Sequence, residues 1–358
     1  MRVNKMKYVY VILVFLLCGC SRSFRSDSES CKVSVDVDFS VVEECLPLAD
    51  IVSAKQIIPL SLPKGEVIGR PVQVCTSDSC LFVYDQLQQA IYRFTKDGTF
   101  LNKIHRQGQG PGEYTTVTRL MVGSHPEALY VYDKVAGKIH IYTFTGDFLR
   151  TITTEYMANH ITLLPDGSFL CFTPDFIYNG PCGLWRMSAD GKLCKMLLEY
   201  KEKYPVVSAY WNRFYAVSSQ TVGIACPATD RYLHYDCKAD SVSMELQINS
   251  RQHTTRSFAG IENSMDVSRP YWACLIYACS PDIIFGIWTE QNGDPHAVYT
   301  LYDKRTNAMT CYKTLDASSV GMDNWGHPVS SDMPGCLVTY LTEESDDESM
   351  SLCVYRLI

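Results

Sequence analysis

The chain has 358 residues, of which 46% are hydrophobic and 20% are charged, a composition typical of a globular protein. The formal net charge is −7 and the charges are interspersed, which argues against a nucleic-acid-binding protein because such proteins concentrate basic residues on one face. The length would suit two domains, but all-β barrels and propellers often reach it as one unit.

The N-terminus has the pattern of an export signal. A basic segment at residues 2–7 precedes an apolar run at residues 8–17, which is too short to span a bilayer. The next residues, 17–20 (LCGC), resemble a bacterial lipobox, in which the last cysteine is lipidated after cleavage. We therefore predict that residues 1–19 are a lipoprotein signal peptide and that acyl chains on Cys20 anchor the protein to a membrane. A plain secretory peptide or a short membrane anchor is the alternative, and each also implies export.

Two further regions follow the signal. Residues 20–50 are predicted to be the lipidated cysteine and a tether, and residues 51–358 a propeller domain. The sequence has 16 cysteines, which is unusual for an exported chain. Cys75 and Cys80 flank a short polar turn and could form a disulfide, whereas the alternative is that most cysteines are small buried residues of strands. No C-x-x-C and no paired Cys/His spacing indicates a zinc site.

A pattern of strands and turns recurs along the rest of the chain. An apolar strand at 81–85 is followed by a strand at 91–94, a Lys-Asp-Gly turn and a strand at 100–104. A second copy with the same order begins at residue 129. Four later copies begin with the segments 168–172, 222–225, 283–288 and 335–340. Strands upstream of the first five copies are expected at 71–74, 118–122, 160–164, 211–216 and 272–277.

The repeat predicts the fold. The 308 positions from 51 to 358 give about 51 residues for each of six copies, and four-stranded units of this size arranged radially form a β-propeller. The sixth copy lacks its fourth strand, and residues 54–60 form a strand without a partner. Placed as the outer strand of the sixth blade, this segment closes the ring and removes an exposed sheet edge. We therefore predict an all-β, six-bladed β-propeller with four-stranded antiparallel blades; an open β-solenoid or a seven-bladed ring is the alternative.

Residues 106–114 (RQGQGPGEY), together with 57–68 and 81–85, resemble the six-bladed β-propeller lipoproteins of gut-type anaerobic Gram-negative bacteria, which have NHL-like blades. The resemblance covers residues 50–358 and is strongest in blades one and two. It implies the fold and a location in the cell envelope, but no agreed activity. Surface lipoproteins of that family carry acidic residues directly after the lipidated cysteine, and residues 21–25 contain none. A periplasm-facing anchor and an outer-membrane anchor therefore both stay open.

The candidate binding residues lie where loops should form the rim of the central channel. Loops that lead into the inner strands share one face with the loops between second and third strands, and ligands commonly bind there. The ligand-binding candidates are Arg106, Gln109, Glu113, Tyr114, Trp211, Arg213, Trp272, Trp325 and His327. Aromatic faces with Arg and His suit a glycan, peptide or protein ligand, and packing between blades is the alternative for each residue.

Other chemistry has little support in the sequence. Residues 108–112 do not follow the G-x-G-x-x-G pattern and lack the Lys-Ser/Thr of a phosphate loop, so their glycines are expected to allow a tight crossover. No G-x-S-x-G, H-E-x-x-H or calcium-loop spacing is present. We therefore predict no catalytic residue, no metal ligand and no cofactor, with His160 and His327 the best metal candidates.

Three functions stay open at this stage. The leading hypothesis is a lipid-anchored monomer that binds a ligand or partner protein at the channel rim, with no role in nucleic-acid binding. The competing hypothesis is a propeller enzyme of the lyase or lactone-hydrolase type with a site in the central channel, and the third is a bare scaffold. Two or more histidines or carboxylates converging on the channel would favour the enzyme, whereas an aromatic-lined channel without them would favour binding.

Overall fold

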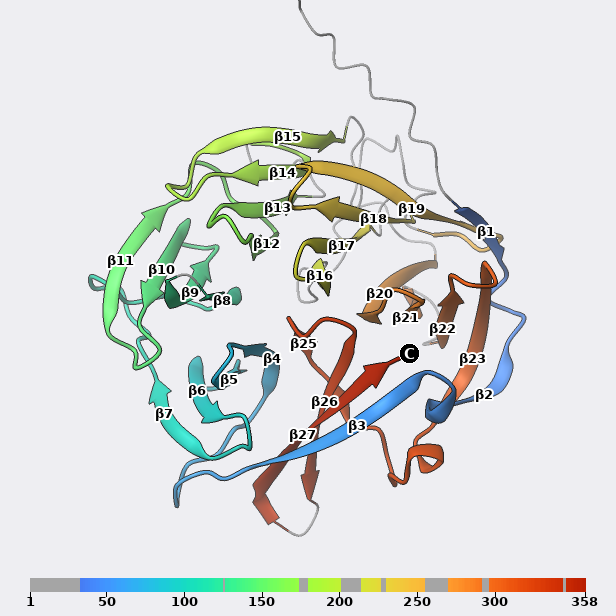
Figure 1. The fold of residues 1–358 in the computed structure, drawn as a ribbon, viewed down its shortest axis with the longest axis horizontal. Coiled ribbons are helices and arrows are strands. Elements are labelled where there is room, and N and C mark those ends of the chain that lie inside the picture. Colours follow the sequence, from blue (N-terminus) through green and yellow to red (C-terminus); the bar gives the residue numbers. More distant parts are fainter. Residues whose placement is uncertain are drawn as a thin grey trace, which may run out of the picture. The chain divides into compact units, whose positions relative to one another are not determined.

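The computed structural model describes residues 33–124, 126–173, 180–200, 214–226, 230–254, 270–291, 296–343 and 346–358. The expected signal peptide, Cys20, Trp211 and Arg213 lie outside the described residues. Residues 31–358 form one compact unit, and its six small sheets are arranged in a ring (Figure 1). This confirms the six-bladed β-propeller. Within the described ranges, no helix is long and apolar enough to cross a membrane.

Blades one to three follow the order that the repeat predicts. Each sheet runs from its inner to its outer strand in chain order, with antiparallel neighbours. Blade one contains β4 (Pro71–Thr76), β5 (Cys80–Asp85), β6 (Ala90–Thr95) and β7 (Phe100–Ile104); blade two contains β8 (Arg119–Ser124), β9 (Glu127–Asp133), β10 (Lys138–Tyr142) and β11 (Phe148–Thr153); blade three contains β12 (His160–Leu163), β13 (Phe169–Thr173), β14 (Gly183–Met187) and β15 (Leu193–Glu199).

Blades four to six keep this order and add strands from elsewhere in the chain. Blade four contains β16 (Phe214–Ser218), β17 (Thr221–Cys226), β18 (Arg231–Asp236) and β19 (Ser241–Ser250); blade five contains β20 (Tyr271–Cys279), β21 (Ile283–Gln291), β22 (Ala297–Asp303) and β23 (Ala308–Asp316); blade six contains β24 (His327–Pro328), β26 (Cys336–Glu343) and β27 (Asp346–Leu357). A short 3-10 helix, η3 (Ser318–Val320), lies between blades five and six in the chain.

The N-terminal strand β3 (Val52–Leu60) is the outer strand of blade six, as the sequence predicts. It pairs antiparallel with β27, with Leu60 opposite Met350 and Val52 opposite Leu357. The seam to blade one is close-packed at Gly98, which has a φ of +90° and whose added Cβ would clash with the carbonyl oxygen of Pro59. Only glycine fits there, so this turn holds the closing strand against the first blade.

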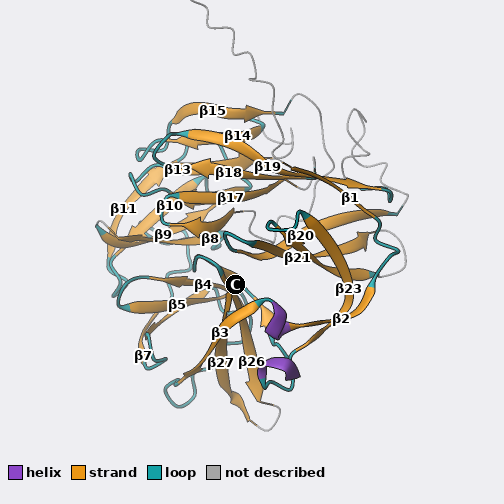
Figure 2. Cartoon of the chain, turned by 45° about the vertical axis from the view of Figure 1, so that its right-hand side comes forward, coloured by secondary structure: helices purple, strands orange, loops and turns teal. Residues whose placement is uncertain are grey.

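The propeller fold begins before residue 51. The strands β1 (Val33–Val37) and β2 (Glu43–Pro47) add to blades four and five, where they pair in parallel with the outer strands β19 and β23 (Figure 2). The 3-10 helix η1 (Leu48–Asp50) then leads into β3. Part of the expected tether is thus structured, because Leu46, Leu48 and Ile51 are buried in the cluster between blades five and six.

A third added strand, β25 (Ser330–Ser331), pairs in parallel with β4 at the inner edge of blade one. β25 and β16 lie near the centre of the ring (Figure 1). Three of the sheets therefore have five strands rather than the expected four. The added strand brings residues from the C-terminal part of the chain beside the inner strands of the first blades.

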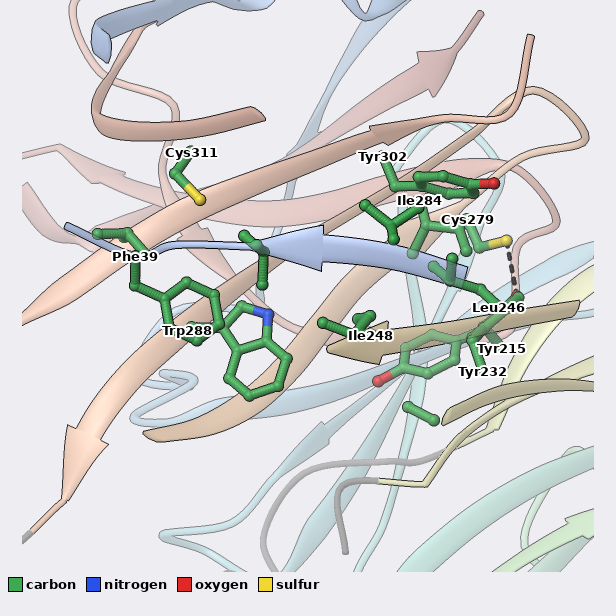
Figure 3. Packing of buried hydrophobic residues seen from close by; sticks show 14 residues of the cluster. Phe39, Tyr215, Tyr232, Leu246, Ile248, Cys279, Ile284, Trp288, Tyr302 and Cys311 are labelled. Atoms are coloured by element: carbon green, nitrogen blue, oxygen red, sulfur yellow. Dashed lines mark hydrogen bonds between the residues drawn. The ribbon is translucent and has the colours of Figure 1, made fainter. Parts of the chain in front are cut away.

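Clusters of buried hydrophobic residues fill each interface between neighbouring blades. Both faces of the middle strands are covered, which explains the continuous apolar runs such as β5, where every residue is buried. Between blades four and five, the centroid of the Phe39 ring lies 4.7 Å from that of Trp288 (Figure 3). It also lies 5.0 Å from the centroid of the Trp272 ring. Removing an aromatic side chain from such a core costs about 3–5 kcal/mol.

The described cysteines are all free thiols. Cys75 and Cys80 are buried in the cluster between blades one and two and do not form a disulfide. Burial raises the pKa of the Cys75 thiol. The interpretation of most cysteines as small buried residues fits the structure.

Candidate functional site

The crossover, residues 106–114, joins β7 to β8 and is held by its own hydrogen bonds. The amide of Tyr114 donates to the carbonyl of Arg106 at 3.0 Å, and the amide of Gly108 donates to the carbonyl of Tyr114 at 2.9 Å. The Tyr114 ring is fully buried, and its hydroxyl donates to the carbonyl of Gln89 at 2.7 Å. Tyr114 therefore fixes the crossover to the loop that follows β5.

The remaining part of the crossover is also occupied by internal contacts. The Glu113 carboxylate accepts a hydrogen bond from the amide of Gly110 at 2.9 Å. The Tyr142 hydroxyl donates to the carbonyl of Gly112 at 2.8 Å. Gly112 has a φ of +73°, and an added Cβ would lie 2.5 Å from the Phe148 ring. These contacts support the structural interpretation of the glycines, while the side chains of Arg106, Gln109 and Glu113 stay exposed.

A buried aspartate at the end of the second strand supports each neighbouring loop. Asp85 accepts from the amides of Gly69 at 2.8 Å and Arg70 at 3.0 Å. Asp133 accepts from the amide and the hydroxyl of Thr115, each at 2.6 Å. Both carboxyl groups belong to fully buried residues. The repeated Tyr-Asp of the sequence therefore holds the chain as it enters blades one and two.

The other described candidates lie elsewhere in the ring. Trp272 stacks on Phe39 between blades four and five. Trp325 packs against Tyr277, with ring centroids 5.9 Å apart, in the cluster between blades five and six. His327 is exposed at the start of β24. The structure thus gathers Arg106, Gln109, Glu113 and Tyr114 in one loop but does not join them to the aromatic candidates.

The histidines named as metal candidates pack against aromatic rings. His160 stacks on Phe172 with centroids 6.1 Å apart, and the His327 ring lies 5.1 Å from Tyr340. Among the described residues, no group of three His, Cys, Asp or Glu side chains could hold a metal ion.

A cavity of about 400 Å³, here called the channel cavity, lies at the inner edges of blades two, three and four. Its lining includes Arg119, Thr162, Phe214, Tyr215, Ser218 and Asp332. It also contacts the loops between first and second strands, at Pro165 and Gln220. Because successive strands of a blade alternate in direction, these loops lie on the face opposite the crossover. The volume suits a small molecule.

Two ionisable side chains in the channel cavity have unusual surroundings. Arg119 on β8 is 8% exposed, and its Nη1 donates to the Ser330 hydroxyl at 2.7 Å while its Nε has no partner. Asp332 follows β25 and accepts from the amide of Thr76 at 3.0 Å. Burial raises the pKa of Asp332 to about 6, although the Thr76 amide and the Arg119 charge act to lower it. Perturbed groups in a cavity mark a candidate functional site.

A charged network joins the loop between β12 and β13, which contributes Pro165 to the channel cavity, to blade four. Arg186 on β14 contacts Asp166, in the same loop as Pro165, and its Nη1 lies 3.3 Å from the Asp240 carboxylate. Lys195 lies 2.9 Å from Asp240. Burial acts to raise the pKa of Asp240, but hydrogen bonds from Tyr235 and Lys195 outweigh it and the pKa is lowered. The network therefore stays ionised at neutral pH and joins blades three and four beside the cavity.

The sequence did not predict Arg119 or Asp332 as residues of a functional site. The segment 118–122 was expected as an inner strand, but a single arginine in it carried no sign of what it faces. Asp332 is brought to the same cavity only by β25, whose two residues are too few to show a strand pattern. The one available signal was a charged residue within an otherwise apolar inner strand.

A second cavity of about 380 Å³ lies on the outside, between β1 and β23. Three carboxylates line it, those of Asp36, Asp38 and Glu43. Asp38 accepts from the hydroxyl and amide of Ser40 and from the Gln252 amide, and Asp36 accepts from the Asn249 amide at 3.1 Å. The hydrogen bonds from Ser40 and Gln252 lower the pKa of Asp38 to about 2. With two of its three carboxylates so occupied, this cavity is the weaker candidate.

A family model described as Domain of unknown function (DUF4934) matches residues 33–351. The chain belongs to this family. The match begins at β1, so the family's domain includes the two strands that lie before residue 51. No curated protein matches the chain.

Solved structures share the fold at low identity. A Bacteroides fragilis protein named as a candidate exported protein is 14% identical, with a TM-score of 0.69 over 91% of this chain and 100% of that one. A DUF4221 member from Bacteroides vulgatus is 9% identical, with a TM-score of 0.54 over 86% and 97%. A virginiamycin B lyase from Staphylococcus aureus is 12% identical over 84% and 99%, and its TM-score of 0.40 carries no argument about activity. These likenesses show the fold alone.

Proposed function

We propose that this protein is an exported, lipid-anchored propeller of the cell envelope that binds a small ligand in the channel cavity. The observation that carries the proposal is Arg119, a buried cation that lines a cavity of ligand size and has no ion pair among the described residues. Buried charges are normally paired, so this one is suited to a group that arrives from solution.

The lining of the channel cavity favours binding over catalysis. In the part of the chain that the structure describes, it contains one carboxyl group, Asp332, and no histidine. Aromatic rings of Tyr130, Phe214 and Tyr215 contribute to it. By the criterion of converging histidines or carboxylates, the enzyme hypothesis has less support than a binding site.

The proposal of export and lipid anchoring rests on the lipobox-like residues 17–20 and on the family resemblance. The same resemblance is the reason for describing the blades as NHL-like. The name of the Bacteroides fragilis neighbour supports the same location. Replacing Cys20 by Ser should abolish incorporation of a palmitate analogue in cells. Labelling that persists in this variant would contradict the lipid anchor.

The exposed side chains of the crossover stay a second predicted surface. Arg106, Gln109 and Glu113 face solvent on the opposite side of the ring from the channel cavity. A glycan, peptide or protein partner bound there would depend on these side chains and not on the cavity.

Thermal-shift screening of glycans, peptides and metal ions tests the proposal, because a ligand raises stability by mass action. A compound that binds in the channel cavity should lose its effect in a Ser218→Trp variant, since Ser218 is an exposed residue of the lining and the indole would fill the space. An Arg106→Gln, Glu113→Gln double variant serves as the matched control on the other face. Shifts that survive Ser218→Trp but vanish in the control would place binding on the crossover instead.

A further inference from the structure

The charge state of the channel cavity indicates what kind of ligand it accepts. A guanidinium has five donors and needs several acceptors when it is buried. Arg119 makes one hydrogen bond, to the neutral Ser330 hydroxyl, and burial lowers its pKa. None of the ion pairs among the described residues includes Arg119.

The carboxyl group that shares the cavity attracts this cation but does not form an ion pair with it. Asp332 directs both oxygens to the amide of Thr76, at 3.0 and 3.2 Å. Its raised pKa also reduces its negative charge near pH 6. Arg119 therefore keeps donors that no described acceptor uses.

We propose that the channel cavity binds a small carboxylate-bearing molecule and that the Arg119 guanidinium receives its carboxylate. This inference rests on the proposed function and names the ligand class. Arginine suits a planar carboxylate because its donors form a fork of matching geometry. Arg119 is the single cation of the described lining, so once Asp332 is protonated the guanidinium balances one negative charge, whereas a phosphate dianion would still be undercompensated.

The rest of the lining fits the remainder of such a ligand. Thr162, Ser218 and Gln220 offer hydrogen-bonding groups, and Val122 and Phe214 offer apolar surface. A cavity of about 400 Å³ has room for a monosaccharide acid or a dipeptide. A monosaccharide acid and a dipeptide both carry a carboxylate but differ in the rest of the molecule, so matched pairs of probes can distinguish them.

Isothermal titration calorimetry of the purified chain with two probe pairs tests the inference. The pairs are glucuronate with glucose, and N-acetyl-alanyl-alanine with N-acetyl-alanyl-alanine amide. The acid of one pair should bind at least tenfold more tightly than its neutral partner, and the pair that shows this identifies the source. Arg119→Gln should weaken that binding by tenfold or more, whereas Arg150→Gln, at an exposed position outside the cavity lining, should leave it unchanged.

Arg119→Lys provides a second variant in case Arg119→Gln does not fold. Lysine keeps the positive charge but lacks the two parallel N–H donors of a guanidinium, so we expect a loss of affinity for the acid that is smaller than in Arg119→Gln. Equal binding of acid and neutral partners, or binding that is unaffected in both Arg119 variants, would overturn the carboxylate while leaving a ligand in the cavity intact. If none of the four probes binds, the carboxylate inference fails, and the proposed function is judged separately by the Ser218→Trp comparison.

Discussion

The crossover is only a few residues from Arg119 in the sequence, but it lies on the opposite face of the ring from the loops that border the channel cavity. In the crossover, the glycine amides, Glu113 and Tyr114 use their hydrogen-bonding groups within the protein. In the channel cavity, Arg119 keeps unused donors although it is almost fully buried. The more conspicuous sequence motif thus builds the fold, and an inconspicuous arginine marks the candidate site.

The largest expected effect comes from the centre of the crossover. Tyr114→Ala should lower the free energy of unfolding by about 3–5 kcal/mol, because it removes a fully buried ring and the hydrogen bond to Gln89. Urea denaturation measures this loss. Tyr114→Phe keeps the ring and should lose less. A ligand-binding defect in Tyr114→Phe without a loss of stability would show that the crossover takes part in binding.

A smaller loss is expected at the left-handed glycine of the crossover. Gly112→Ala should destabilise the fold by about 1–3 kcal/mol more than Gly65→Ala, because the added methyl group would press on the Phe148 ring. Gly65 is the matched control: its φ of +84° is similar and no atom lies within 4 Å of an added Cβ. Thermal unfolding of the two variants compares them. Equal losses would mean that Phe148 moves aside freely.

The channel cavity should respond to pH. As the pH falls from 7 to 5, Asp332 takes up a proton, because its pKa is about 6, and a negative charge next to the bound carboxylate disappears. The charged groups that act on Asp332 are Arg119 on β8 and Lys96 after β6, and the Cys75 thiol on β4 also interacts with it. Affinity for the carboxylate probe should therefore rise roughly tenfold, the equivalent of about 1.4 kcal/mol.

Calorimetry at several pH values, with the Asp332→Asn variant, checks this prediction. The variant should bind at pH 7 as tightly as the wild type does at pH 5, and its affinity should not change with pH. Asp323→Asn, at an exposed position outside the cavity, is the control. A pH dependence that persists in Asp332→Asn would assign the titration to another group.

The smallest effect on stability is expected at Arg119 itself. Arg119→Met should change the free energy of unfolding by less than about 1 kcal/mol or raise it, since it removes an unpaired buried charge. Arg186→Met is the contrasting variant, because Arg186 is paired with Asp166 and Asp240; its loss leaves Asp166 without that cation and Asp240 with Lys195 alone. If Arg119→Met destabilises more than Arg186→Met, Arg119 is a structural residue and the comparison with the crossover fails.

The fold could be predicted from the sequence because its repeat is carried by local patterns. Asp-Gly turns occur in the first and third copies, apolar runs such as β5 recur along the chain, and the number of strands implied that residues 54–60 complete the last blade. β1 and β2 escaped notice because short alternating segments do not reveal a partner far away in the chain. Arg119 and Asp332 could not be predicted for the same reason. Their role depends on their lying in one cavity, and the pairing of β25 with β4 brings Asp332 to the cavity that Arg119 lines.

The pairing of β3 with β27 also determines when the protein can finish folding. These strands stand near opposite ends of the sequence, so the hydrogen bonds that close the ring cannot form before the last strand has been synthesised. Contacts of such long range slow folding. Until then, β3 has no partner strand and presents its edge to other chains. The growing protein is therefore exposed to aggregation through β3 during most of its synthesis, and a chain truncated before β27 would leave β3 unpaired.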